Sequence, residues 1–401
     1  MKLPPSPWQT RESMAELLSA LGVEAGDTRY VGGCVRDTLL GLDVSDVDLA
    51  TRLEPEAVVE RLGKARIKAV PTGLAHGTIT AVLGGGPIEV TTLRRDVSTD
   101  GRRATIAYTD DWREDAARRD FTINALSADP LTLAVHDYFG GEADLVARRL
   151  RFIGNPLTRI AEDHLRILRF FRFHARFGEG EPDEAALEAC VARANDLMAL
   201  SRERIADELL KLLALPAPAG TLRLMVERGI LRPVLPEIVM EGVDRLDALV
   251  ASEIAAGVET APLRRLAALL PPDVEIAAAV AARLRLSKRA AKRLISAASQ
   301  EGTADAPEAL AFRIGAEEAT DRLLLAQAPA ERVKALAAWE KPIFPLTGGD
   351  LIAMGLRPGP VVASILRKVE RAWIQGGFSA DPEEIRKLAR ARVDQALRDR
   401  Q

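Results

Sequence analysis

The β-type patterns of this sequence stop at Pro156, and this change constrains the fold more than any other feature. Before it, four short runs have the composition of strands, namely TRYV, DVDLA, HGTITAVL and IEVTTL, and helical stretches such as Pro55 to Ala65 separate them. After it, the sequence is almost continuously helical, with short breaks such as those around Pro216 and Pro342. We therefore predict a mixed α/β head of about 150 residues followed by an all-helical body.

Composition supports this division and limits the class of protein. A chain of 401 residues has room for two to three domains, and 47% hydrophobic with only 4% aromatic residues favours helix. The net charge of −3 argues neither for nor against RNA, so a nucleic-acid surface must come from local arrangement of the 55 basic residues. Two cysteines and the lack of an apolar leader or membrane-length run predict a cytoplasmic protein with no membrane association.

Asp46-Val47-Asp48 is the first candidate site. In a strand alternate side chains share a face, so the two carboxylates would project together while Val47 and Leu49 face a core. Such a pair suits two metal ions and a triphosphate; the alternative is two solvated strand acids. A third acid from a neighbouring strand often completes such sites. Glu89 is the candidate, although it is equally compatible with an acid on an edge strand.

Gly32 and Gly33 precede this pair at a strand-to-helix turn. Their backbone would let phosphates approach closely, and Arg36, one turn into the next helix, could contact phosphate oxygens. Taken alone, the two glycines also fit an ordinary turn.

A second charged patch is RRDFTINAL, from Arg118 to Leu126. We interpret Arg119 as a ligand for triphosphate or ribose, and Asp120 as a ligand for a ribose hydroxyl, either directly or by orienting Arg119. The apolar residues that follow alternate as in a strand entering the core, and a solvated charge cluster before a buried strand is the alternative. Arg94 to Ala104 is predicted to be a mobile loop at the edge of the head, and Gly140-Gly141 a hinge.

The third patch is Glu162 to Phe177, predicted as one helix. Asp163, Arg166, Arg169 and Arg172 recur every three residues along one side, with Arg176 nearby. A basic solvent face is the alternative, but these arginines have few acids within the helix to pair with.

Asp163 and Arg166 would form a protein template for base selection. A carboxylate accepts and a guanidinium donates, so the pair matches cytosine and adenine, whose pairing edges offer a donor beside an acceptor. Guanine and uracil offer the reverse order. Unpaired groups on a wrong base would supply discrimination of several kcal/mol.

Five segments in this order, GGCVRD, DVD, RRDFTINAL, FGG and EDHLR, closely resemble the bacterial class II tRNA nucleotidyltransferase and poly(A) polymerase family. The resemblance implies an α+β fold. A polymerase-β-like nucleotidyltransferase head with a mainly antiparallel sheet would span residues 1–150. A helical neck with the nucleotide-selecting helix would span 151–215, and a helical body and tail that bind the tRNA acceptor arm would span 216–401.

The resemblance also implies roles for the matching residues. Asp46 and Asp48 would be catalytic and hold Mg²⁺, while Gly33 and Arg36 would contact the nucleotide. Arg119 would hold triphosphate or ribose. Asp163 and Arg166 would read the base edge, with Arg169 and Arg172 on the nucleotide's phosphates or in supporting roles.

The activity implied is template-independent addition of C, C and A to the 3′ end of tRNA from CTP and ATP, with release of pyrophosphate. Poly(A) polymerases of this family carry a basic-aromatic run of the GRRFRL kind, whereas this chain has GKARIKAVP from Gly63. Enzymes that add only CC are expected to lack part of the flexible loop, which is complete here. The alternatives are a poly(A) polymerase that adds A tails to RNA 3′ ends, an A-adding or CC-adding tRNA nucleotidyltransferase, and a catalytically silent RNA-binding protein. The intact DVD and EDHLR segments argue against the last. DNA is not expected as a partner.

The helical part contains one strongly basic stretch, Arg283 to Arg293, with six Lys or Arg residues and no acid. It fits either a tRNA phosphate contact or a simple solvated helix face.

Overall fold

The computed structural model describes residues 1–74, 77–100, 103–378 and 381–398. The chain forms two compact units, Met1–Met240 and Glu241–Gln401. The unit boundary therefore falls at Met240, beyond the expected end of the neck at residue 215. The finer division into head, neck and body remains a prediction.

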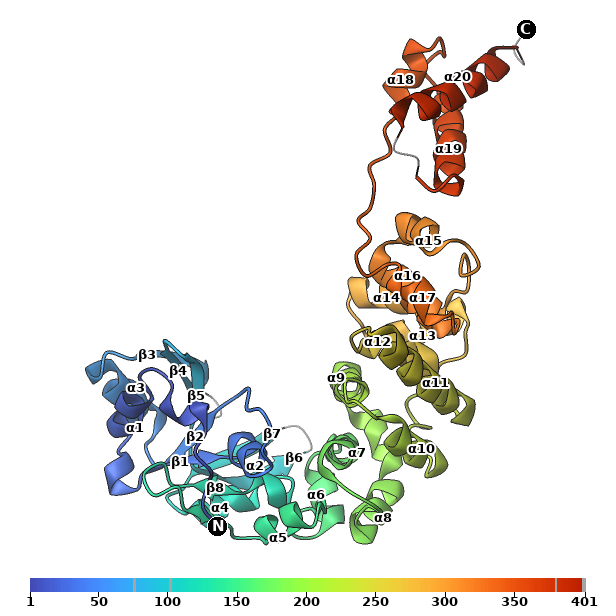
Figure 1. Ribbon diagram of the computed structural model, residues 1–401. Coiled ribbons are helices and arrows are strands. Elements are labelled where there is room, and N and C mark those ends of the chain that lie inside the picture. Colours follow the sequence, from blue (N-terminus) through green and yellow to red (C-terminus); the bar gives the residue numbers. More distant parts are fainter. Residues whose placement is uncertain (75–76, 101–102, 379–380, 399–401) are drawn as a thin grey trace. The chain divides into compact units, whose positions relative to one another are not determined.

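The first unit is built on a mixed sheet in its N-terminal part (Figure 1). Among the described residues this sheet has seven strands in the order β3-β4-β5-β2-β1-β8-β9. Its strands are β1 Thr28–Val31, β2 Asp48–Thr51, β3 Lys68–Gly73, β4 Thr78–Leu83, β5 Gly86–Thr92, β8 Ser127–Ala128 and β9 Val135–His136. Only the β2–β5 pair is parallel in this sheet as described; the other pairs are antiparallel. The mainly antiparallel α+β head is confirmed.

The strand predictions hold where alternation was clear. The run TRYV coincides with β1, and the other three runs coincide with β2, β4 and β5 to within a few residues. The helix predicted from Pro55 is α3, Pro55–Lys64. Val47 and Leu49 are buried as expected, because they face the core of the head.

Two local predictions in the head were wrong. The segment expected to be a loop contains all of β6, Arg94–Asp100, and the first two residues of β7, Arg103–Tyr108; the two strands pair antiparallel as a separate two-stranded sheet. Residues 101 and 102 of that predicted loop lie outside the described residues. RRDFTINAL does not form a strand: Phe121 is extended, and a 3₁₀ turn, η4, follows at Thr122–Asn124. Its apolar side chains are nevertheless buried, because a tight turn also delivers them to the core.

Short helices cover and extend the head. They are α1 Met14–Ala20, α2 Gly33–Leu39, α3, α4 Trp112–Ala117 and α5 Gly141–Val146, with 3₁₀ turns η1 Pro7–Thr10 and η2 Val23–Ala25. At the start of α5, a Cβ on Gly141 would lie 2.4 Å from the carbonyl oxygen of Thr122. The second glycine of the FGG segment thus permits a close backbone approach, and the hinge stays a prediction.

The rest of the first unit is helical. Its elements are α6 Pro156–Glu162, α7 Arg166–Phe177, α8 Glu184–Ala192, η5 Ala194–Ala199, α9 Arg202–Leu213 and α10 Ala219–Glu227. The single helix predicted from Glu162 to Phe177 is broken, since α6 ends at Glu162 and α7 begins at Arg166. Asp163 lies in the break with an extended backbone, and its Oδ1 accepts from the backbone N–H of Leu165. Asp side chains compete in this way for backbone donors and favour helix ends.

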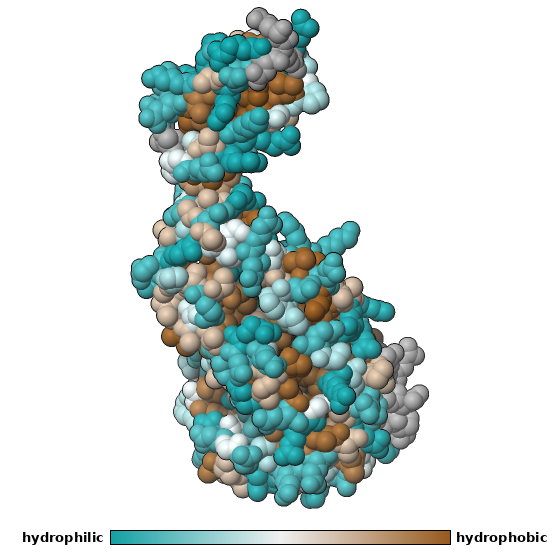
Figure 2. All heavy atoms as spheres, turned by 90° about the vertical axis from the view of Figure 1, so that its right-hand side faces the viewer, coloured by the Kyte–Doolittle hydropathy of each residue, from teal (hydrophilic) through white to brown (hydrophobic). Residues whose placement is uncertain are grey.

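The second unit is all helical where the structure describes it. Its helices are α11 Met240–Ala256, α12 Pro262–Leu269, α13 Val274–Arg283, α14 Lys288–Ala298, α15 Pro307–Ile314, α16 Ala316–Leu325, α17 Ala330–Lys334, α18 Gly348–Ala353, α19 Pro360–Gln375 and α20 Pro382–Arg398. The last three share a core that includes Leu351, Val369, Trp373 and Val393 and also takes in Phe312 of α15. On the face drawn in Figure 2, hydrophilic and hydrophobic side chains are interspersed. In the residues that the structure describes, no helix is both long and apolar enough to span a membrane.

Candidate nucleotide-binding and catalytic site

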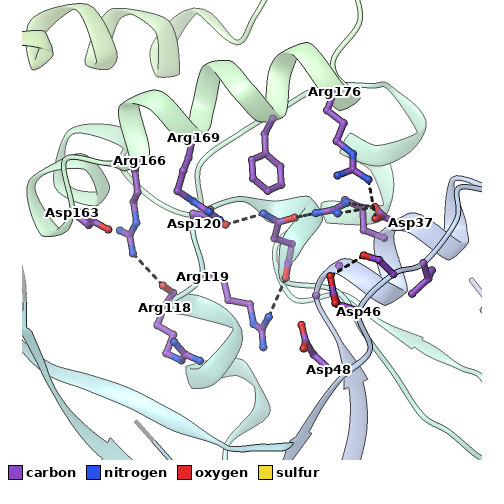
Figure 3. A pocket seen from close by; sticks show the side chains of 17 residues that line it. Asp37, Asp46, Asp48, Arg118, Arg119, Asp120, Asp163, Arg166, Arg169 and Arg176 are labelled. Atoms are coloured by element: carbon purple, nitrogen blue, oxygen red, sulfur yellow. Dashed lines mark hydrogen bonds and ion pairs between the residues drawn. The ribbon is translucent and has the colours of Figure 1, made fainter. Parts of the chain in front are cut away.

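A polar pocket of about 650 Å³ in the first unit collects nearly all the predicted site residues. Figure 3 shows that its charged side chains come from the β2 region, the end of α4 and α7 and face a common space. The lining residues are Gly32, Gly33, Arg36, Asp37, Val44, Ser45, Asp46, Asp48, Arg118, Arg119, Asp120, Asn124, Asp163, Arg166, Arg169, Phe173 and Arg176. Segments more than a hundred residues apart in the sequence therefore meet in one cavity.

Asp46 and Asp48 lie side by side on the lower edge of this pocket in Figure 3. Only Asp48 belongs to β2; Asp46 is exposed in the segment just before the strand. The two carboxylates therefore share a side as predicted, but the strand is shorter than expected. Ser45 Oγ donates to Asp46 Oδ2 at 2.8 Å. Neither carboxylate forms an ion pair with any residue that the structure describes.

Burial and like charges raise the pKa of Asp48 to about 6, with Glu89 the strongest of the neighbouring carboxylates and Asp46 adding to the effect. Glu89 is the direct register partner of Asp48 across the β2–β5 pair. Because β5 is an inner strand, Glu89 is not an edge-strand acid; it is exposed and does not line the pocket.

The donor set at this edge fits a hard divalent cation. Two neighbouring carboxylates repel one another, and a cation between them would relieve the repulsion. In the described part of the chain, no group of three or more His, Cys, Asp or Glu side chains is arranged to hold a metal. Mg²⁺ is commonly held by one or two carboxylates, with substrate phosphates and water completing its shell. Two protein carboxylates beside a phosphate-binding surface meet that requirement.

The glycine turn sits against the same pocket. Gly32 has a φ of +70°, and a Cβ there would lie 3.0 Å from Nη1 of Arg119. Glycine is therefore required both by the backbone conformation and by the nearby side chain of Arg119.

Arg36 lines the pocket but is largely buried. It pairs with Asp37, donates to Asn124 Oδ1 and stacks at 4.1 Å on the ring of Phe177. Its guanidinium is more constrained than a simple phosphate ligand would be.

Arg118 and Arg119 reach the pocket from the C-terminal end of α4. Both pair with one buried carboxylate, Asp115: its Oδ1 lies 2.9 Å from Arg118 Nε, and its Oδ2 lies 3.3 Å from Arg119 Nη2. Arg119 also donates to the carbonyl of Asn124 at 3.5 Å. One acid for two arginines leaves positive charge directed at the pocket, as a triphosphate requires.

Asp120 is buried and orients Arg169 instead of Arg119. Its Oδ2 accepts from Arg169 Nε at 2.8 Å, and its Oδ1 accepts from Asn124 Nδ2 at 2.9 Å. Although burial opposes ionisation, the guanidinium of Arg169 and these hydrogen bonds hold the pKa of Asp120 below its ordinary value. The suggestion that Asp120 orients Arg119 was therefore wrong, because the nearer guanidinium comes from α7.

Arg172 does not line the pocket. Its Nε donates to Glu208 of α9 at 2.6 Å, and Glu208 also lies 3.8 Å from Arg169 Nη1. Of its two expected roles, this position fits the supporting one. The arginine stripe lacks acids within its own helix, but Asp120, Glu208 and Asp37 supply them from other elements.

Asp163 and Arg166 flank the break between α6 and α7, and both line the pocket. Asp163 Oδ2 accepts from Arg204 Nη2 of α9 at 2.7 Å. Arg166 donates to Glu162 and to the carbonyl of Arg159. The structure thus places an acceptor and a donor close together, each held by a group of opposite charge.

Sequence reasoning missed the supporting residues. Glu208 and Arg204 give no local pattern with their partners, because Arg172 and Asp163 lie on other elements. The run ERIADELLKLL contains two of them, Arg204 and Glu208, four residues apart on α9. That spacing on one helix face was the signal available for these two residues. Asp115 was different: it lies three and four residues before Arg118 and Arg119, so its pairing matches a local helical spacing.

Comparison with known proteins identifies the same regions. The head matches the family model of the poly A polymerase head domain over residues 28–151. Residues 181–240 match the model described as the probable RNA and SrmB-binding site of polymerase A. With this fold, the pocket defines a nucleotidyltransferase.

Relatives of known function match along almost the whole chain. The mouse mitochondrial CCA tRNA nucleotidyltransferase 1 is 33% identical, covering 93% of this chain and 89% of that protein. The CCA-adding enzyme of Lacticaseibacillus paracasei is 32% identical over 92% of each. The crystal structure of the Bacillus stearothermophilus CCA-adding enzyme in complex with CTP aligns with a TM-score of 0.77 and 26% identity, covering 97% of this chain and all of that one.

The chain belongs to the CCA-adding branch of the tRNA nucleotidyltransferase and poly(A) polymerase family. It is therefore an enzyme that transfers nucleotides, and enzymes of this family generally use divalent metal ions.

Proposed function

We propose that this protein adds C, C and A to the 3′ end of tRNA from CTP and ATP without a nucleic-acid template. The observation that carries the proposal is the single pocket in which two carboxylates, a cationic wall and an Asp–Arg pair meet. A nucleoside triphosphate offers matching chemistry to each part. The names of the relatives support the same substrates.

The reaction joins the tRNA 3′-oxygen to the α-phosphorus of the nucleotide and breaks the bond to the β-phosphate oxygen. The hydroxyl proton is lost, and pyrophosphate leaves. Asp46 and Asp48 would hold Mg²⁺, which when bound supplies charge neutralisation and acidifies the attacking hydroxyl. Arg118 and Arg119 would hold the leaving phosphates, so positioning and electrostatics provide the catalysis. Gly33 would allow close approach of the nucleotide to the backbone.

Asp163 and Arg166 would select the base. When a correct base binds, Asp163 must offer it an oxygen lone pair that Arg204 does not use. Arg166 must likewise offer it an N–H that Glu162 does not use. Arg169, held by Asp120, lies next to this pair and would contact the ribose or phosphates. Arg172 and Arg36 would support this wall, because each is tied to protein partners.

We further propose that residues 216–401 bind the tRNA acceptor arm through its backbone. Exposed Lys288, Arg289 and Lys292 at the start of α14 support this, since phosphate contacts dominate recognition of A-form RNA. The proposed location is the cytoplasm, which the free, buried thiols of Cys34 and Cys190 support because reducing compartments keep thiols unpaired.

The deciding experiment is the product ladder on a tRNA transcript that lacks CCA. With CTP and ATP and Mg²⁺, three additions in the order C, C, A are expected; CTP alone should give two additions. A long ladder with ATP alone would instead identify a poly(A) polymerase, and arrest after CC or addition of A only to a CC end would identify a partial enzyme. Absence of incorporation under all conditions would favour a silent RNA-binding protein.

A further inference from the structure

Asp115 is a buried carboxylate of α4 with a relative exposure of 4%, and the mechanism above gives it no contact with substrate. It accepts hydrogen bonds from two segments. Its Oδ1 receives Arg118 Nε at 2.9 Å and the backbone N–H of Arg94 at 3.3 Å, and its Oδ2 receives Arg119 Nη2 at 3.3 Å. One side chain thus joins two pocket arginines to the first residue of β6.

The base of β6 is fixed next to the catalytic strand. The backbone N–H of Leu93 donates at 2.7 Å to the carbonyl of Thr51, the last residue of β2. Leu93 is fully buried against Val31 and Trp112. Since β2 begins with Asp48, Asp115 connects the phosphate-facing arginines to the segment after β5 that is hydrogen-bonded to the last residue of this strand.

We propose that Asp115 is a positioning residue that aims Arg118 and Arg119 at the triphosphate and ties their position to the base of the β6–β7 sheet. The inference rests on the function proposed above and adds to it. Two guanidiniums beside each other repel, and both long side chains have many rotamers. A shared buried carboxylate offsets the repulsion and fixes both directions before substrate arrives.

The charge state of Asp115 agrees with this geometry. Burial works against ionisation, but the guanidiniums of Arg119 and Arg118 and the hydrogen bonds hold the pKa of Asp115 below its ordinary value. The group is therefore a carboxylate at neutral pH. It accepts hydrogen bonds only, so all three donors are satisfied without competition.

The proposal makes a specific kinetic prediction, because CTP and ATP share the triphosphate and differ in the base. The substitution Asp115→Asn keeps the shape but loses the charge, so KM should rise about tenfold for both nucleotides with an unchanged ratio between them. Glu114→Gln is the matched control: it lies next in the chain on the same helix, contacts Thr109 and Arg95, and should leave both KM values unchanged.

Binding of inorganic tripolyphosphate, measured by calorimetry on the full-length protein, provides a readout independent of catalysis. Asp115→Asn should weaken it about tenfold as well. In the Arg119→Gln background, Asp115→Asn should add less than in the wild type, because one of the two arginines through which Asp115 acts is already lost. Amide exchange at Arg94 should accelerate in Asp115→Ala, which removes the acceptor.

Unchanged KM and tripolyphosphate affinity in folded Asp115→Asn would overturn the proposal, as would full additivity with Arg119→Gln. A changed CTP-to-ATP ratio would overturn it too, because Asp115 would then act on base selection. If Asp115→Asn does not fold, Asp115→Glu serves in its place, and loss of tripolyphosphate binding with retained fold is expected. Should the wild type fail to add C, C and A, the function proposal fails, while tripolyphosphate binding still tests Asp115.

Discussion

The molecule has two clusters built from the same residue types, arginines and acids, but the clusters differ in how their charges are arranged. In the second unit, Arg264 is only 2% exposed and pairs with Glu253 and Asp321, while Arg265 takes the other Glu253 oxygen and Arg293 takes Asp321. Arg293 also pairs with Glu317, so three arginines meet three acids. The cluster is closed and links α11, α12, α14 and α16.

The pocket of the first unit is open and its charge is segregated. Asp115 and Asp37 each form ion pairs with two arginines, so positive charge is in excess along one wall of the pocket. On the opposite edge, Asp46 and Asp48 form no ion pair within the described part of the chain. A closed network compensates its charges internally, whereas a segregated one leaves both signs available to a ligand and a metal ion.

The largest effect on activity should follow removal of the two carboxylates of the pocket that form no ion pair within the described part of the chain, Asp46 and Asp48. Asp46→Ala with Asp48→Ala should lower nucleotide incorporation by about a thousandfold or more, because metal-ion catalysis supplies several kcal/mol. The thermal midpoint in metal-free buffer should be unchanged or higher, since two repelling carboxylates are removed. Single-turnover incorporation and circular dichroism measure the two effects. Substantial incorporation by the folded double variant would show that the metal assignment is wrong.

Substitutions in the closed cluster of the second unit should change the free energy of unfolding and leave nucleotide incorporation unchanged. Arg264→Ala leaves two acids buried with fewer partners and should cost about 3–5 kcal/mol of unfolding free energy. Urea denaturation of the variant measures this cost. Arg289→Ala is the control, because Arg289 is 91% exposed in its side chain and lies 3.8 Å from Glu317; its cost should be about 0.5 kcal/mol or less. Equal costs for the two variants would contradict the distinction between closed and exposed ion pairs.

Within the open pocket, specificity and catalysis should separate. Asp163→Ala should relax selection among the four nucleotides by at least about tenfold, since it removes the acceptor for the amino groups of C and A. Misincorporation of UTP and GTP in single-nucleotide assays gives the measurement. Asp207→Asn, an exposed acid on α9 paired with Lys211, is the control and should leave selection unchanged. Retained discrimination in Asp163→Ala would refute the protein-template interpretation.

The raised pKa of Asp48 also predicts that the stability of the protein depends on pH. The pKa of Asp48 is raised to about 6, so the folded protein binds this proton more tightly than the unfolded chain. In metal-free buffer the associated stability is present at low pH and is lost as the pH rises through about 4 to 6. Stabilisation by Mg²⁺ should show the opposite trend and disappear as the pH falls below about 6, because the cation requires the carboxylate. Thermal midpoints with and without Mg²⁺, compared with Asp48→Asn, test both signs.

The smallest effect is expected on the exposed side of α14, whose Arg293 belongs to the closed cluster. Replacing Lys288, Arg289 and Lys292 with Gln should reduce the slope of log Kd for tRNA against log salt by about 0.7–0.9 for each phosphate interaction that the substitutions remove. Stability should hardly change. A salt slope identical to that of the wild type would remove these three residues from the RNA surface.

Much of the site was visible in the sequence because short segments carry several of its groups at once. Asp46 and Asp48, Gly32 and Gly33, and Arg118 to Asp120 are local constellations that retain their meaning in any surrounding fold. The burial of the apolar residues between the charged ones was predictable too, because these residues must enter the core. The backbone that delivers them was less predictable: the Asp163 turn and the 3₁₀ turn after Phe121 follow from side-chain hydrogen bonds and packing that periodicity does not record.

The amino-acid sequence specifies the division into a mixed head and a helical remainder, most residues of the pocket and the class of chemistry. Tertiary packing decides which charges meet across elements: Asp120 with Arg169, Glu208 with Arg172 and Arg204 with Asp163; it also brings Asp115 to the start of β6. The reason is physical. Helix and strand periods report on neighbours within about one turn, whereas an ion pair between distant segments depends on how whole elements pack.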